Sequence, residues 1–255
     1  MKLPQWLFVC ACACIAVTAD AEMRSIHVFT SLADNRHQGI IPVPEKLGNG
    51  DDPDNNLYWG ALYGVRTYFR KSPDWELVSK TSNPTTCVLE RCVFKHKTAD
   101  VVLIADAYKG SEIRRAVGDF LIAAGGGNAG KLELSGSQAG THGGADLVAY
   151  VGHNGLMDFT IPSDATELRK GGREAIVLAC NSKPYFLPWL ARLKARPVLL
   201  TTGLMAPEAY TLKATLDGWI SGSSGDEIKE RAAAAYNKYQ KCGIKGARRL
   251  FYSEN

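Results

Sequence analysis

The chain lacks the features that define several large classes of protein. No apolar stretch after residue 22 approaches the ~20 residues needed to cross a bilayer. The 30 basic and 26 acidic residues leave a net charge of only +4, which is too small and too scattered to indicate nucleic-acid binding. The chain has no internal repeat and no low-complexity tract, and its 45% hydrophobic and 22% charged residues are typical of a globular protein.

Several catalytic and cofactor motifs are missing too. No Gly-Lys-Ser or Gly-Lys-Thr of a P-loop is present, and no Gly-x-Ser-x-Gly elbow follows a strand. Residues 125–130 fit Gly-x-Gly-x-x-Gly literally, but they follow a predicted helix, so we interpret them as a helix C-cap and loop. Asp51, Asp52 and Asp54 lack the spacing of a calcium-binding loop, which favours a solvated loop over a calcium site. We expect no cofactor.

The first 21 residues have the pattern of a secretory signal peptide. Lys2 provides a positive start, residues 3–17 are almost wholly apolar, and residues 19–21 (Ala-Asp-Ala) form a small-x-small cleavage site. The apolar segment is short for a membrane anchor, which is the less favoured alternative. We therefore predict cleavage before Glu22 and a secreted or periplasmic mature chain, residues 22–255, without a membrane span.

Cleavage would reduce the cysteine count from seven to four. Cys87 and Cys92 lie five residues apart in a strand-like stretch, and in an oxidising compartment this spacing predicts a disulfide bridge across a tight turn. No Cys-x-x-Cys or His-x-His pair accompanies them, so we predict no metal site. Cys180 and Cys242 remain to be explained.

The apolar pattern alternates between strands and helices along the chain. Strands are predicted at 26–32, 75–80, 88–95, 101–105, 147–151, 175–179 and 198–201, and helices at 57–69, 111–124, 184–194 and from 226. This alternation predicts βαβ units, a mostly parallel sheet and a three-layer αβα sandwich in a single α/β domain. Residues 33–56 form a long loop insertion, and a loop of this length in a compact domain is usually functional or mobile.

A histidine and a cysteine each follow a predicted buried strand. His153 comes just after the strand 147–151, and Cys180 follows the strand 175–179. The carboxyl ends of parallel strands are where catalytic groups gather in open α/β sheets. A thiolate is a nucleophile, and a nearby imidazole can deprotonate the thiol and later protonate a leaving amine. The bland alternative, in which both residues only pack, is about equally favoured by the sequence.

The order of these pieces resembles the caspase-like fold of clan CD cysteine peptidases. That group includes caspases, legumains, gingipains and CHAT-domain proteases, and the resemblance covers residues 100–241. Its most specific pieces are residues 151–153 (Val-Gly-His) and 178–182 (Leu-Ala-Cys-Asn-Ser). The strand at 197–201 and a helix from Pro207 also occur where such proteins carry them.

The resemblance implies a role for each matching residue. Cys180 would be the nucleophile and His153 the acid and base, while the backbone N–H of Cys180 and of a glycine after the histidine would hold the oxyanion. This family usually has glycine directly after the histidine, but here Asn154 intervenes before Gly155. We therefore assign the oxyanion position to Asn154 and Gly155 as an expectation.

Two classes of function follow from this resemblance. The first is an exported cysteine peptidase-like hydrolase that acts on the peptide-type carbonyl of a peptide or protein substrate. The second is a non-catalytic caspase-like binding or scaffold protein in which Cys180 is buried or oxidised. Asp106 and Asp158 lie near expected strand ends and are candidates for binding a basic residue of the substrate.

Overall fold

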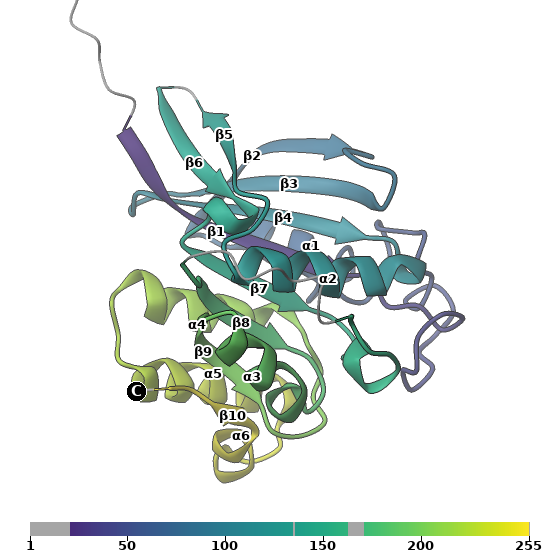
Figure 1. Cartoon of the computed structure of the whole chain (residues 1–255). Helices are drawn as coiled ribbons and strands as arrows, with labels where there is room; N and C mark the ends of the chain where they lie inside the picture. The colour runs from purple at the N-terminus through teal and green to yellow at the C-terminus, as the bar shows by residue number, and fades with distance from the viewer. Residues whose placement is uncertain (1–20, 135, 163–170, 255) are drawn as a thin grey trace, which may run out of the picture.

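A computed structural model of the chain describes residues 21–134, 136–162 and 171–254 (Figure 1). The predicted signal segment before residue 21 lies outside these residues. The strands are β1 (Ala21–Ser31), β2 (Trp75–Ser82), β3 (Val88–His96), β4 (Val101–Tyr108), β5 (Gly130–Leu134), β6 (Ser137–Thr141), β7 (Leu147–Val151), β8 (Glu174–Leu178), β9 (Arg196–Thr201) and β10 (Phe251–Tyr252). The main sheet has the order β10-β9-β8-β7-β1-β4-β3-β2, and the β5–β6 hairpin joins it at the start of β1.

The centre of the sheet is parallel. β4, β1, β7, β8 and β9 run in one direction, while β10 at one edge and the β2–β3 hairpin at the other are antiparallel. This confirms the predicted α/β class and the mostly parallel sheet. β7 and β8 are direct neighbours, with Val151 opposite Leu178, so the strands that precede His153 and Cys180 are adjacent and parallel.

Helices cover both faces of the sheet. The helices are α1 (Val65–Lys71), α2 (Ile113–Ala124), α3 (Ser182–Arg192), α4 (Ala209–Ile220), α5 (Gly225–Gln240) and α6 (Ile244–Leu250). Alternate residues of each strand enter opposite cores: Ile176 and Leu178 of β8 pack with α1, α4 and α5, whereas Ala175 and Val177 pack with α2 and α3. The predicted three-layer sandwich is thus confirmed (Figure 1).

The segment after β1 is an ordered coil held by one buried asparagine. The fully buried Asn56 side chain accepts hydrogen bonds from the N–H groups of Ala33 and Tyr58, and donates to the carbonyls of Ala33 and Asn49. Every hydrogen-bonding position of this amide is therefore used, which ties the two ends of the predicted 33–56 loop together.

The helix predicted over residues 57–69 is shorter than expected, because α1 begins only at Val65. Residues 57–64 instead form turns in which the carbonyl oxygen of Asn56 accepts from the N–H groups of Trp59, Gly60 and Ala61. A Cβ on Gly60 would lie 2.1 Å from the carbonyl oxygen of Asp54, so only glycine allows this close approach. The segment is rich in hydrophobic residues because its turns are buried, not because it is helical.

The predicted disulfide between Cys87 and Cys92 is wrong, and both are free thiols. Cys87 immediately precedes β3 and Cys92 lies within it, so the chain between them is extended and makes no turn. Five residues of strand separate their Cα atoms by roughly 16 Å, beyond the ~7 Å that a disulfide spans. An odd spacing also points the two side chains to opposite faces: Cys92 packs in the core under α1 and α4, and Cys87 packs on the α2 side.

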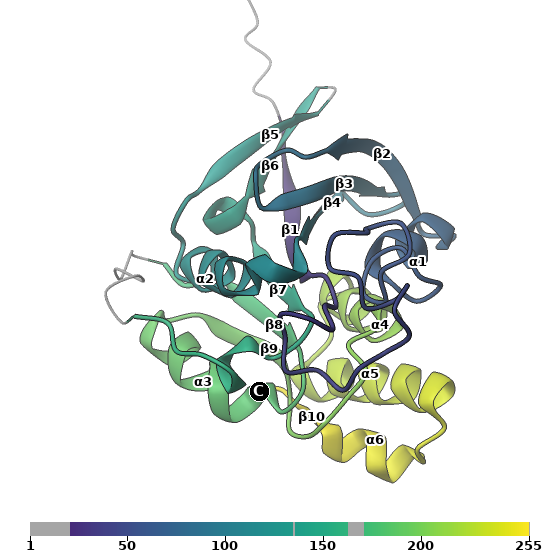
Figure 2. The same ribbon diagram turned by 90° about the vertical axis from the view of Figure 1, so that its right-hand side faces the viewer.

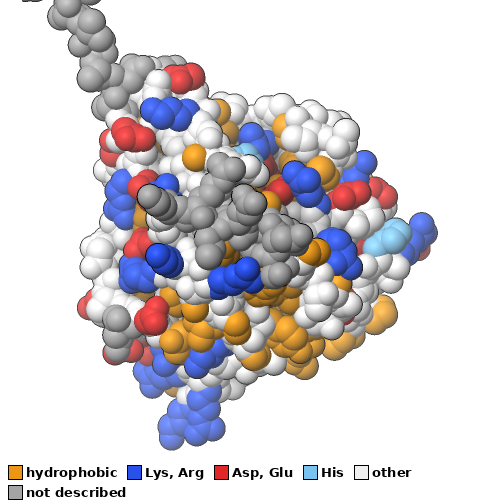
Figure 3. Space-filling view, viewed as in Figure 1, with side chains coloured by type: hydrophobic (Ala, Val, Ile, Leu, Met, Phe, Trp, Pro, Cys, Tyr) orange, Lys and Arg blue, Asp and Glu red, His pale blue; other side chains and the backbone are white. Residues whose placement is uncertain are grey.

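The glycine-rich run is a helix C-cap, as predicted. α2 ends at Ala124, and the N–H of Gly125 bonds back to the carbonyls of Leu121 and Ala123. In the described part of the chain, no helix is long and apolar enough to cross a membrane. On the face in Figure 3, acidic and basic side chains are interspersed, and hydrophobic side chains gather over the lower half, where α3 lies in Figure 1.

Candidate active site

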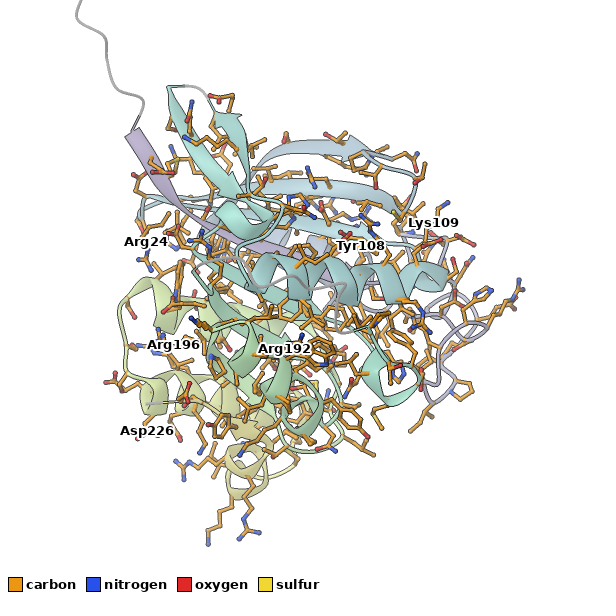
Figure 4. All side chains as sticks on the ribbon, in the orientation of Figure 1. Arg24, Tyr108, Lys109, Arg192, Arg196 and Asp226 are labelled. Carbon is orange, nitrogen blue, oxygen red and sulfur yellow. The ribbon has the colours of Figure 1, made fainter. Side chains whose placement is uncertain are left out.

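The parallel strands end together at one edge of the sheet. In Figure 4, Arg24 and Arg196 mark the amino ends of β1 and β9 at the left, and Tyr108 and Lys109 mark the carboxyl end of β4 at the right. Figure 2 looks onto this carboxyl edge, and the coil after β1, drawn in dark blue, lies in front of the ends of β7, β8 and β9. In α/β sheets ligands bind at this edge.

A cavity of about 550 Å³ opens at the carboxyl edge. Its walls come from the coil after β1 (residues 39–41 and 57–58), the turn after β7, the segment 204–208 after β9, and Tyr236 and Gln240 of α5. Cys180 and His153 both line this cavity, as their positions after neighbouring strands predict. Its volume lies within the range of small-molecule and peptide side-chain sites.

His153 is held in place by hydrogen bonds at its ring and at its backbone. The ring Nε2 and a carboxylate oxygen of Asp158 are 2.7 Å apart, and the same oxygen accepts the N–H of Gly39 at 3.0 Å. The Tyr150 hydroxyl donates to the carbonyl of His153 at 2.7 Å. His153 is 7% exposed, so its ring is fixed by packing as well as by these bonds. Asp158 thus positions the histidine and ties the coil after β1 to it.

Asn154, which separates the histidine from the glycine, braces the site. Its side chain is fully buried and its amide nitrogen donates to the carbonyl of Cys180 at 2.8 Å, so the histidine turn and the cysteine turn are bonded to each other. Its side-chain oxygen accepts the N–H of Leu156. The N–H of Gly155 is also used, because it donates to the carbonyl of His153 at 3.0 Å. The structure therefore does not offer the predicted oxyanion donors of Asn154 and Gly155 to the cavity.

Cys180 presents a free, partly buried thiol between β8 and α3. Its sulfur lies against the backbone of Met205, 3.4 Å from the carbonyl oxygen and 3.5 Å from the nitrogen, which donates to it. Asn181 follows in the left-handed region (φ 46°), which turns the chain sharply into α3. The sharp turn places the thiol just before the first residue of α3.

Comparison with known proteins adds no family to this geometry. No family model, no curated protein and no solved structure matches the chain. The side chains of the cavity alone therefore indicate its function.

Asp106, predicted to bind substrate, does not line the cavity. It is fully buried on β4, where both of its oxygens accept from Arg91, at 2.6 and 2.7 Å, and one also accepts from His27 at 3.0 Å. Burial opposes ionisation of this carboxyl, but the hydrogen bonds from Arg91 and His27 hold its pKa well below the usual range. Asp106 is therefore a structural anion within the sheet, and a substrate side chain would have to displace Arg91 to reach it.

His27, Asp106 and His142 have donor atoms within 4.8 Å of one another, which is a metal-like spacing. The residues present do not fit a metal. His27 Nδ1 accepts the N–H of His142 at 2.7 Å, so its proton is on Nε2 and is donated to Asp106. Neither nitrogen of His27 then has a lone pair for an ion, and Arg91 occupies the carboxylate. The cluster is an internal ion-pair network.

Three residues of the cavity were not among the site residues predicted from the sequence: Tyr58, Met205 and Glu208. Burial, with smaller effects from Cys180 and Glu208, raises the pKa of the Tyr58 phenol, which keeps it a neutral hydroxyl near the thiol. Met205 and Glu208 belong to an irregular segment between β9 and α4 that carries no pattern. These residues reach the cavity through the crossover of the chain, and no local signal in the sequence marks them.

Proposed function

We propose that this protein is an exported cysteine peptidase-like hydrolase of the caspase-like type, with Cys180 as nucleophile and His153 as acid and base. The observation that carries the proposal is that Cys180 and His153 line one cavity at the carboxyl edge, with the histidine ring bonded to Asp158. A nucleophile, a base and a group that orients the base are the recurring parts of acyl-transfer sites.

In the proposed reaction the Cys180 thiol gives its proton to His153, and the sulfur attacks the carbonyl carbon of a peptide bond. The Asp158 carboxylate accepts from Nε2, which leaves Nδ1 of the ring to take and return the proton. The protonated ring then gives its proton to the leaving amine, and a thioester remains on Cys180. Water, deprotonated by the same ring, hydrolyses the thioester and restores the thiol. The backbone N–H of Cys180 is the proposed donor to the oxyanion.

The rim of the cavity supports a polypeptide substrate. Ile41 (81% exposed), Leu204 (71%) and Met157 (44%) line it, and they are three of the five exposed large hydrophobic side chains among the described residues. Apolar side chains gathered at a site mark a surface that another molecule covers. An extended peptide with apolar residues would cover this rim as its carbonyl approaches Cys180.

We expect His153→Ala to lower kcat/KM for peptide substrates by about 1,000-fold, because one group supplies both proton transfers. Asp158→Asn should lower kcat by about 100-fold, since the ring loses the anion that orients it. The measurement is turnover of a fluorogenic peptide library by the purified chain and each variant, with thermal unfolding as the check on folding.

Cys242→Ala is the matched control, because this exposed thiol lies outside the cavity. It should leave turnover unchanged. If His153→Ala and Asp158→Asn both turned over peptides at the wild-type rate, the proposed roles would be refuted. If all proteins were inert but bound peptides, the non-catalytic binding protein would be the better description.

We also propose that the chain is exported and that its mature form begins at Glu22. The support is the sequence pattern of residues 1–21, and the first strand of the sheet begins at this point, with Glu22 paired opposite Gln138. Intact-mass analysis of the protein recovered from the extracellular or periplasmic fraction should give a chain that starts at Glu22. A recovered chain that retains residues 1–21 would contradict the proposed signal peptide.

A further inference from the structure

The cavity contains one carboxylate that no cation balances. Glu208 is the only acidic residue among the described residues that line the cavity, and no lysine or arginine lines it. Its oxygen Oε2 accepts from the hydroxyl of Tyr210 at 2.8 Å and from the amide of Gln240 at 3.2 Å, and both donors are neutral. No hydrogen bond or ion pair within the described residues involves the other oxygen, Oε1.

Two buried carboxylates of the described chain, Glu90 and Asp106, are paired with cations. Glu90 lies 2.6 Å from the ammonium of Lys80 and 3.1 Å from the guanidinium of Arg66, and Asp106 is paired with Arg91. Burying a carboxylate without a cation is unfavourable, because water is removed and no opposite charge replaces it. Burial accordingly raises the pKa of Glu208. Glu208 differs from Glu90 and Asp106 in that no cation contacts it within the described residues.

Glu208 does not cap the helix that it precedes. It is the N-cap residue of α4, yet its side chain makes no capping hydrogen bond to the helix. The carboxylate turns instead toward the cavity, where Tyr210 and Gln240 hold Oε2 and thereby aim the group. A carboxylate held by neutral donors and otherwise surrounded by apolar walls is a preformed site for a cation.

The carboxylate lies within reach of a substrate bound at the thiol. The backbone of Met205 contacts the Cys180 sulfur. Glu208 is three residues after Met205, so the Cα atoms of Met205 and Glu208 are at most about 11 Å apart. Tyr58 and Tyr236 line the same cavity as Cys180 and Glu208, and the Tyr236 hydroxyl accepts the N–H of Ala206, which lies between Met205 and Glu208 in the chain. The wall of this part of the cavity is made of aromatic and aliphatic side chains.

We propose that this part of the cavity binds the side chain of a lysine or arginine, with the aliphatic stem against the apolar wall and the charged end on Oε1 of Glu208. Lysine and arginine combine a long apolar stem with a terminal charge, which matches an apolar wall ending in a carboxylate. If the protein is the proposed hydrolase, this subsite makes it cleave after basic residues; this second half of the inference rests on the proposed function. Glu208 then has the specificity role that Asp106 and Asp158 do not fill.

Binding alone tests the subsite without relying on catalysis. We expect the Cys180→Ala protein, which cannot turn over a substrate, to bind N-acetyl-lysinamide at least about 10-fold more tightly than N-acetyl-norleucinamide in an NMR titration. The two probes share the aliphatic stem and differ in the ammonium. Adding Glu208→Gln should remove the difference, since glutamine keeps the acceptor for Tyr210 and Gln240 but lacks the charge. Equal binding of the two probes before this substitution would overturn the proposal.

Turnover tests the second half of the inference. With peptides that differ only at the residue preceding the cleaved bond, the native enzyme should prefer lysine or arginine over norleucine by about 100-fold, and Glu208→Gln should lower this ratio to near one. Glu208→Asp, which keeps the charge, should retain a preference and guards against a variant that fails to fold. If the lysine probe bound selectively but no peptide were cleaved, the subsite would stand and the proposed hydrolase would fail. Cleavage without preference for basic residues would refute the subsite alone.

Discussion

Replacing Cys180 with alanine should lower peptide turnover by at least about 10,000-fold while the protein stays folded. The loss is near total because no other group in the cavity can form the covalent thioester. The fold should survive because the thiol faces the cavity, and the hydrogen bonds that the structure gives its sulfur are to the backbone of Met205. The measurement is kcat/KM on the fluorogenic peptide library, together with the Tm of each protein.

An electrophilic peptide probe provides an independent readout of the same prediction. It should label the wild-type chain once, at Cys180, and should not label Cys180→Ala even though three other free thiols remain among the described residues. Cys92 is a natural internal control, since burial raises the pKa of its thiol to about 12 and keeps it protonated. Full turnover by Cys180→Ala would refute the proposed nucleophile.

Replacing Asp106 with alanine should lower the free energy of unfolding by about 3–5 kcal/mol. The substitution leaves the partly buried Arg91 guanidinium and the buried His27 ring without the carboxylate that both of them contact. Losing one partner of such a network is severe because the remaining charge is only partly hydrated. Urea unfolding monitored by circular dichroism measures the change.

Glu230→Ala is the matched control for Asp106→Ala. Glu230 is also a carboxylate bonded to an arginine, at 2.7 Å from Arg248, but this pair is on the surface. Its removal should leave the unfolding midpoint nearly unchanged, because water and salt already screen exposed pairs. Equal unfolding midpoints for Asp106→Ala and wild type would show that the Asp106 network does not stabilise the fold.

The same network gives the folded state a defined response to acid. Burial lowers the pKa of His142 from 6.5 to about 4, so between these values the unfolded chain binds a proton that the folded chain does not. The free energy of unfolding should therefore fall as pH falls through this window. Asp106 affects stability at lower pH than His142 does. The pKa of Asp106 is lower in the folded chain than in the unfolded chain, so its contribution to the free energy of unfolding is complete above about pH 4 and is lost as the pH falls further. His142→Asn should remove the first slope, and asparagine tolerates the left-handed backbone at this position (φ 52°).

The fold class was predictable because each central strand is marked by a local run of apolar residues. Continuous apolar runs such as residues 101–105 and 147–151 are buried on both faces, and the structure places them in the central parallel sheet. Strands that follow each other along the chain usually pair in the sheet, and β7 and β8 do so, which brings His153 and Cys180 to one edge. Local sequence patterns and a general rule of chain topology were therefore sufficient to predict the fold class and the edge at which His153 and Cys180 meet.

The failed predictions have a common cause, which is that a residue's partners are not near it in sequence. The Cys87–Cys92 bridge failed once the chain between them proved to be a strand, whose period of two separates the side chains. The prediction of a helix from residue 57 was wrong because the turns around Asn56 are buried and are therefore as rich in apolar residues as a helix would be. Asn154 and Gly155, predicted to hold an oxyanion, do not line the cavity: the side-chain amide of Asn154 donates to the carbonyl of Cys180, and the N–H of Gly155 donates to the carbonyl of His153.

The sequence alone determined the α/β class, the mostly parallel sheet, and the meeting of His153 with Cys180 at one edge, because these follow from periodicity and from the pairing of consecutive parallel strands. Only the tertiary structure decided which carboxylates are paired with a cation. Asp106 meets His27 across 79 residues and Arg91 across 15, whereas Glu208 meets neutral Gln240 across 32 and no cation within the described chain. A carboxylate looks the same in the sequence whether a cation neutralises it or not, and that difference separates a structural anion from a binding site.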